Sequence, residues 1–235
     1  MINNIREGKG EKMSRTDEQI KKDIVDELYW DARVDASKIN VTVENGVVTL
    51  SGSVPVYRQL SIARIAAWTM QGVVDLIDNL EVSSVLSPPL PTDAELESRA
   101  ANVLEWEALI DELSITVSVA DGIAVLEGSV DAYWKKPYAE NKVASIQGIL
   151  GVENKLSVVP TKSISDELIA DDVAAAFKRD TMVVPENITV EVKDGTVTLS
   201  GKALTWLERN AAEDDVLFTP GVIGIVNNIK IGLES

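Results

Sequence analysis

The side chains of this sequence that could do chemistry are carboxylates, because the chain contains neither cysteine nor histidine. Without cysteine there are no disulfides, thiol nucleophiles or thiolate metal sites. Without histidine, the usual general base near neutral pH, the Ser-His-Asp triad and the commonest zinc ligand are also missing. A glycosidase built on paired carboxylates is the main enzyme mechanism that the composition still allows.

Adjacent carboxylates occur at 171–172 and at 213–215, in segments with a helical pattern. Successive side chains on a helix point about 100° apart, so these carboxylates cannot converge on one metal ion. The sequence also contains no calcium-loop spacing. We therefore predict that both runs are solvated helix faces, and that the protein is not an enzyme and uses no metal or organic cofactor.

The net charge of −16 over 235 residues argues against a nucleic acid partner, because phosphate backbones select lysine and arginine. Anionic lipid surfaces also repel such a chain at long range, so a membrane contact would need a local apolar or basic patch. No apolar run is long enough for a membrane-spanning helix. The first residues lack the pattern of a secretory signal, which predicts a cytoplasmic protein, or a periplasmic one if the chain is a processed fragment. Met1 and Met13 could each be the true start.

The elements that must position the side chains occur three times. An Asn-Gly or Asp-Gly pair marks each copy, and a second glycine follows it at a constant distance. The glycines concerned are Gly46, Gly122 and Gly195 in the pair, and Gly72, Gly148 and Gly221 further on. We predict module 1 at 16–82, module 2 at 92–158 and module 3 at 165–232. Residues 1–15 form a disordered basic tail, 83–91 a proline-rich linker and 159–164 a shorter linker.

Each module has the same predicted secondary structure. A first helix begins after an N-cap hydroxyl and carries an apolar stripe of helical period. Two alternating strands follow, joined by a type I′ turn, then a second helix and a third strand. The fold class is α/β (α+β), with three αββαβ modules, each a three-stranded mixed sheet that has two helices packed on one face. The N-caps are Thr16, Thr92 and Ser165.

The remaining repeated residues are interpreted as structural. The hairpin register places Gly52, Gly128 and Gly201 opposite the first strand's first residue, where a missing side chain would let a helix approach. The Gly72 column would end the second helix as a C′ glycine. The column Asp78, Asn154 and Asn227 shares a face with apolar residues and is expected to point inward. A buried carboxylate at Asp78 would need hydrogen bonds or a raised pKa.

Positions where one module departs from the others are the candidate functional residues. Leu60 and Ile65 in the second helix of module 1 stand where the other modules have polar residues, and Trp134 of module 2 stands where the others have Arg58 and Leu207. They predict either an exposed surface for a lipid or protein partner, or packing against a neighbouring module. The recurring aromatic column Tyr57, Tyr133 and Trp206 is interpreted as structural. Trp30 and Trp106 are assigned to local packing.

The repeated pattern of alternating valines, Asn/Asp-Gly, Leu-x-Gly, a helix and then Gly-Val with a closing strand resembles the BON domain. Gly46, Leu50, Gly52, Gly72 and Val73 carry it in module 1. The resemblance extends over all three modules, and it implies a non-catalytic domain of osmotic-stress and envelope proteins for which phospholipid binding is the usual proposal.

The leading hypothesis is therefore a stress- or envelope-associated binding module for phospholipid surfaces, with three linked weak sites. The alternative is a cytosolic protein–protein interaction scaffold or self-assembly module, with a homo-oligomer as one form. Lipid binding predicts an exposed apolar or basic patch near Leu60, Ile65 or the basic tail. A scaffold predicts that these residues are buried between modules or between copies of the chain.

Overall fold

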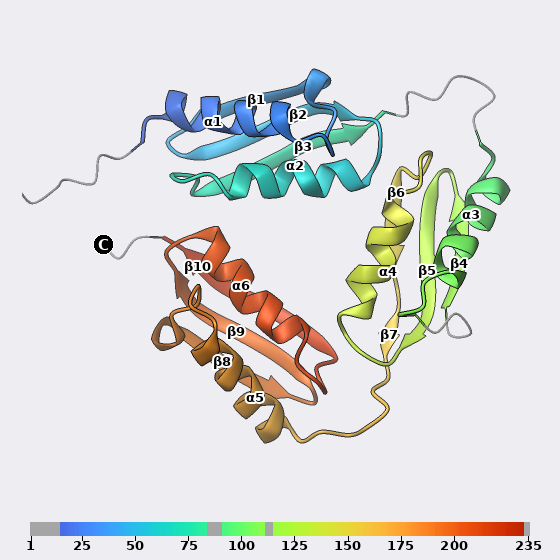
Figure 1. Ribbon diagram of the computed structural model, residues 1–235, viewed down its shortest axis with the longest axis vertical. Coiled ribbons are helices and arrows are strands. Elements are labelled where there is room, and N and C mark those ends of the chain that lie inside the picture. The colour runs from blue at the N-terminus through green and yellow to red at the C-terminus, as the bar shows by residue number, and fades with distance from the viewer. Residues whose placement is uncertain (1–14, 84–90, 111–114, 233–235) are drawn as a thin grey trace, which may run out of the picture.

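The computed structural model describes residues 15–83, 91–110 and 115–232, and it contains three modules of similar fold (Figure 1). The predicted basic tail, apart from Arg15, and most of the proline-rich linker lie outside these residues.

Module 1 consists of α1 (Asp17–Trp30), β1 (Ile39–Glu44), β2 (Val47–Val54), α2 (Arg58–Trp68) and β3 (Asp75–Val82). Module 2 consists of α3 (Asp93–Glu105), β4 (Ile115–Ala120), β5 (Ile123–Val130), α4 (Lys135–Ala144), β6 (Gly151–Asn154) and β7 (Ser157–Val158). Module 3 consists of α5 (Asp166–Arg179), β8 (Ile188–Lys193), β9 (Thr196–Ala203), α6 (Trp206–Leu217) and β10 (Gly224–Ile231).

The first helix of each module begins at the predicted hydroxyl. Thr16 accepts a hydrogen bond from the backbone N–H of Gln19, whose side chain accepts from Thr16 N–H, so the capping box is complete. Thr92 and Glu95 form the same box before α3, and Ser165 caps α5. The predicted apolar stripes are buried in three separate cores.

The hairpin turn of each module is tied to the first helix. Asn45 and Gly46 have positive φ angles of 52° and 76°, as a type I′ turn requires. The two oxygens of Asp17, in the first turn of α1, accept hydrogen bonds from the backbone N–H groups of Asn45 (2.8 Å) and Gly46 (2.9 Å). Asp93 and Asp166 repeat this contact in the other modules.

The sheet order is β1-β2-β3, with β2 antiparallel to β1 and parallel to β3, and module 3 has the same order. A parallel neighbour requires a crossover, which α2 supplies. The predicted mixed sheet and the pairing of Ile39 with Gly52 are both confirmed. In module 2 the third strand is divided into β6 and β7, with Lys155 and Leu156 between them, although the Lys155 N–H still donates to the Leu126 carbonyl oxygen at 2.8 Å.

Two interpretations of glycines need correction. A Cβ atom on Gly52 would lie 2.0 Å from the carbonyl oxygen of Lys38, so the close approach comes from the one-turn 3-10 helix Ala36–Lys38 and not from an α-helix. Gly72 is not the C′ residue of α2, which ends at Trp68 with Thr69 as its C-cap. Gly72 lies in the following turn, where a Cβ atom would meet the Ile20 side chain at 2.8 Å.

The second helices bring the three modules together around the centre of the molecule (Figure 1). At each junction the aromatic residue that precedes or begins one second helix approaches the last turn of another. Trp206 stacks on Trp68 with ring centroids 6.4 Å apart, which joins module 3 to module 1. Tyr133 packs against the module 3 core, and Tyr57 lines a small cavity with Ala144. The aromatic column therefore links the modules in a closed ring.

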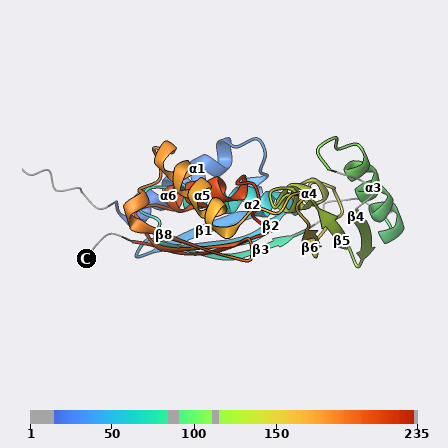
Figure 2. The same ribbon diagram turned by 90° about the horizontal axis from the view of Figure 1, so that it is seen from below.

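The helices and the strands occupy opposite sides of this ring. Seen edge-on, the strands lie along one side, while α1, α2, α4, α5 and α6 lie along the other (Figure 2). Each sheet is thus covered by helices on one face only. Among the described residues, no helix has both the length and the apolar character needed to cross a membrane.

Candidate functional site

The inward column at positions 78, 154 and 227 holds the third strand to the second helix. In module 1, Asp78 forms an ion pair with Arg64 of α2, and its Oδ1 accepts a hydrogen bond from the backbone N–H of Leu80 at 3.0 Å. The carboxylate predicted to need partners therefore has both a cation and an N–H donor.

In the other modules the donor and the acceptor of this contact are exchanged: the strand residue donates and the helix residue accepts. Asn154 donates to Glu140 Oε2 at 3.2 Å, and Asn227 donates to Glu213 Oε2 at 2.8 Å. Glu140 and Glu213 occupy the position of Arg64. The helix residue changes from basic to acidic where the strand residue changes from aspartate to asparagine, which keeps each pair complementary.

Of the two alternatives predicted for Leu60, packing against a neighbouring module agrees with the structure and an exposed surface does not. Leu60 is only 7 % exposed. It lies between α2 and α4, where it lines a cavity together with Asn141 and Ala144, and Arg58 Nη1 donates to the carbonyl oxygen of Asn141 at 3.3 Å. Packing against a neighbouring module accounts for this apolar residue.

Ile65 and Trp134 differ in their surroundings. Ile65 is 48 % exposed on α2, and its role as a partner surface stays a prediction. Trp134 lies at the junction of modules 2 and 3, with its ring centroid 6.3 Å from that of Phe218 and 5.7 Å from that of Tyr138. The contact with Phe218 of module 3 therefore covers part of the Trp134 side chain.

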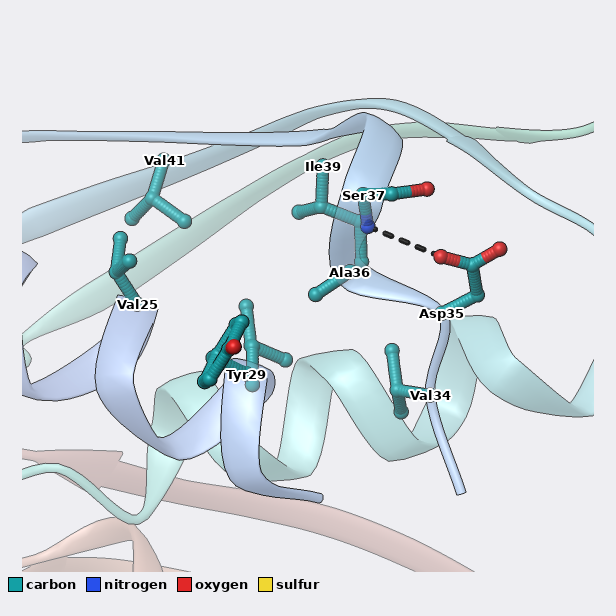
Figure 3. Close-up of a pocket in the computed structure, with 9 residues that line it drawn as sticks. Val25, Tyr29, Val34, Asp35, Ala36, Ser37, Ile39 and Val41 are labelled. Carbon is teal, nitrogen blue, oxygen red and sulfur yellow. Dashed lines mark hydrogen bonds between the residues drawn. The ribbon is translucent and has the colours of Figure 1, made fainter. Parts of the chain in front are cut away.

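An apolar pocket opens beside the end of α1 in module 1 (Figure 3). Its volume is about 310 Å³, and its lining is mostly aliphatic. Val25 and Tyr29 of α1 form one wall, and the segment that leads into β1 forms the other. The residues that line it are Val25, Leu28, Tyr29, Val34, Asp35, Ala36, Ser37, Ile39 and Val41.

Asp35 is the only charged residue in that lining. Its Oδ1 accepts a hydrogen bond from the backbone N–H of Ser37 at 3.1 Å. Hydrogen bonding to Ser37 lowers the pKa of Asp35 below its usual value, so this carboxylate is ionised at neutral pH. The pocket thus combines an apolar interior with one negative charge beside it.

Tyr29 and Trp30 form an exposed aromatic pair at the end of α1, beside the pocket. Tyr29 is 72 % exposed and Trp30 is 79 % exposed, with the two rings in edge-to-face contact at 5.1 Å. Trp106, which follows α3, is 86 % exposed. The predicted local packing is therefore limited for Trp30 to its contact with Tyr29, and it is wrong for Trp106, which is almost fully exposed.

Two residues of the pocket wall differ from their counterparts in both other modules. Tyr29 stands where the other modules have Glu105 and Lys178, and Val25 stands where both have alanine. The comparison of copies that selected Leu60 could also have selected Tyr29. The signal was overlooked because Tyr29 lies off the helical stripe and because the pocket wall comes from a different segment.

The carboxylate runs form no metal site among the residues that the structure describes. Burial raises the pKa of Asp214, with the charge of Glu213 as a further cause. Burial also raises the pKa of Asp215, as do the charges of Asp180 and Asp214. Within the described part of the chain, Asp215 Oδ2 is buried without a hydrogen-bond partner.

Comparison with known proteins identifies the modules. The family model described as BON domain matches residues 16–84, 92–160 and 165–232. Osmotically-inducible protein Y of Escherichia coli (strain K12) is 26 % identical over 144 residues, which cover 59 % of this chain and 72 % of that protein.

Two solved structures also align with most of the chain. The C-terminal domain of CdsD, the structural protein of the type III secretion system of Chlamydia trachomatis, has 13 % identity and a TM-score of 0.27, covering 90 % of this chain and 96 % of its own. The periplasmic domain of the type III secretion inner-membrane protein PrgH from S. typhimurium has 13 % identity and a TM-score of 0.22. The alignment covers 84 % of this chain and 95 % of the PrgH domain. Scores this low support no functional comparison.

Proposed function

The chain belongs to the BON domain family, and from that membership we propose a non-catalytic, stress-associated binding module that attaches to phospholipid surfaces. The apolar pocket at the end of α1, with Tyr29 and Trp30 exposed beside it, carries this proposal. Tyrosine and tryptophan have an apolar body and a polar tip, and they are enriched where membrane meets water. The similarity to an osmotically inducible protein supports the association with stress.

The charge of the chain sets the expected lipid preference. A protein with a net charge of −16 is repelled by anionic lipid at long range, whereas insertion of aromatic and aliphatic side chains needs no lipid charge. We therefore expect binding to zwitterionic vesicles at least as strong as binding to anionic ones. Added salt should strengthen binding to anionic vesicles, because it screens the repulsion.

The test is co-sedimentation with phosphatidylcholine vesicles, with and without phosphatidylglycerol, at low and moderate salt. The double variant Val25→Asp/Tyr29→Asp places two charges in the pocket wall and should weaken binding at least tenfold. Leu168→Asp/Met182→Asp is the matched control, because it adds the same charge at exposed apolar positions of module 3. Ile65→Asp reports whether the α2 surface contributes.

A protein-interaction scaffold is the second candidate, and the burial of Leu60 between modules favours it. Failure of the wild-type protein to sediment with any of the vesicles would end the lipid proposal and leave the scaffold. Equal loss of binding in the pocket variant and in its control would show that added charge, and not the pocket, weakens attachment.

A further inference from the structure

The strands present side chains of two kinds. Residues that alternate with the core-facing ones point away from the helices, and together they form the open sheet face of each module. Because the strands of the three modules lie on the same side of the ring, the three open sheet faces form one broad side of the molecule (Figure 2).

The open sheet face of module 1 is acidic. Its charged residues are Glu44 of β1 and Asp75 and Glu81 of β3, and all three are exposed. The other residues of this face are small polar ones and a few aliphatic ones such as Ile77. No lysine or arginine lies among them.

The open sheet face of module 3 is basic. Lys193 of β8, Lys202 of β9 and Lys230 of β10 are exposed there, against the single acidic residue Glu191. Acidic residues outnumber basic ones in this chain by 38 to 22, so three lysines on one small sheet are a local reversal of the overall charge.

The reversal occurs at equivalent positions of the repeat. Lys193 occupies in module 3 the position of Glu44, and Lys230 occupies that of Glu81. Module 2 has the uncharged residues Ala120 and Ser157 at these two positions. At these two positions the side chains are therefore negative in module 1, uncharged in module 2 and positive in module 3.

We infer that this side of the molecule is a dimer interface, and that its partner is a second copy of the chain. A two-fold axis that lies between the two copies, parallel to the plane of the ring and passing between their modules 2, sets module 1 of each copy opposite module 3 of the other. It places the acidic sheet of each copy on the basic sheet of the other, and both contacts form at once in a closed pair. Two sheets then pack face to face, as in a β-sandwich.

The two copies of module 2 face each other across the axis, and their charges permit this contact. Glu153 and Lys155 neutralise one another as an ion pair at 3.3 Å, which leaves Glu127. Ile123 is exposed on this face and supplies apolar surface. Because the whole side is rich in serine and threonine, association depends on the charges and weakens as salt is added.

The test is sedimentation velocity of the full-length chain over a range of concentrations at low salt. Wild-type protein should sediment as a dimer. Glu44→Lys/Glu81→Lys makes the module 1 and module 3 faces both basic, and Lys193→Glu/Lys230→Glu makes both acidic, so each variant alone should be monomeric. An equimolar mixture of the two should restore the dimer, since each basic sheet then meets an acidic one.

The control Glu18→Lys/Glu167→Lys changes the net charge as the first variant does, at exposed positions of α1 and α5. It should remain dimeric. A monomeric wild type at every concentration, variants that dimerise alone, or a mixture that stays monomeric would each overturn the inference. Assemblies larger than a dimer would also overturn it, because the closed pair leaves no further complementary sheet. No lipid is present, so this result is independent of the proposed function.

Discussion

At the scale of single residues, one contact shows how the modules diverged without losing their packing. Arg64 pairs with Asp78 in module 1, where the other modules pair glutamate with asparagine. The strand residue accepts from a backbone N–H two residues on in every module, so its side-chain oxygen is needed whichever residue is present. Only the other atom of the strand side chain, a carboxylate oxygen in Asp78 or an amide nitrogen in Asn154 and Asn227, is free to change with the helix residue.

We predict that this pair can be exchanged only as a whole. Arg64→Glu alone should destabilise module 1 by about 1–2 kcal/mol, because it sets a carboxylate against Asp78. Arg64→Glu/Asp78→Asn recreates the pair of modules 2 and 3, and its stability should return to within about 0.5 kcal/mol of wild type. Urea unfolding of the four proteins in this cycle measures the coupling, and additive effects would contradict the complementarity.

At the scale of elements, local chemistry explains why so much was predictable. The capped first helices, the Asn-Gly turn and the pairing of Ile39 with Gly52 each depend on residues close together in sequence. The end of α2 was not predictable in the same way. It stops before Gly72 because that glycine is needed in the next turn, packed on Ile20 of a distant helix. Tertiary contacts of this kind leave no local pattern.

We predict that Gly52 tolerates no side chain. Gly52→Ala places a Cβ atom 2.0 Å from the Lys38 carbonyl oxygen at a φ of 109°, so the chain entering β1 must move. The cost should be at least about 3 kcal/mol. Gly201→Ala should behave alike in module 3, since its Cβ would meet the Asn187 oxygen at 2.1 Å. Thermal unfolding measures both.

Gly232→Ala is the control for these two substitutions, because nothing lies within 4 Å of its added Cβ. It should leave the unfolding temperature unchanged. A small effect at Gly52 would mean that the chain entering β1 can shift at little cost, and the hairpin register that recurs in the three modules would then need another cause.

At the scale of the whole molecule, the arrangement of the modules was beyond the sequence. Comparing the copies found residues that differ, such as Leu60 and Trp134, but could not say whether a neighbouring module covers them. Leu60 faces α4 and Trp134 faces Phe218, which lie far along the chain. The pocket beside Tyr29 was missed for a related reason. One of its walls belongs to α1 and the other to the segment that follows the helix, and the sequence does not show how that segment folds back on α1.

The closed ring makes a prediction about the shape of the molecule in solution. Module 3 is joined to module 2 by Tyr133 and to module 1 by the stacking of Trp206 on Trp68. In Tyr133→Ala/Trp206→Ala these two contacts are lost and only the contact of Trp134 with Phe218 is left among the aromatic ones, so module 3 should separate on its linker. Small-angle X-ray scattering should then show a larger radius of gyration, while circular dichroism shows unchanged secondary structure.

The double variant Trp30→Ala/Trp106→Ala removes two aromatic rings that are mostly exposed, so it is the control for this measurement. Its scattering should match that of the wild type. If the interface variant also keeps the wild-type radius, the remaining contact between Trp134 and Phe218 must hold module 3 in the ring, or the modules must be independent already. Scattering of the wild type decides between these two, because independent modules on flexible linkers have a larger radius than the closed ring.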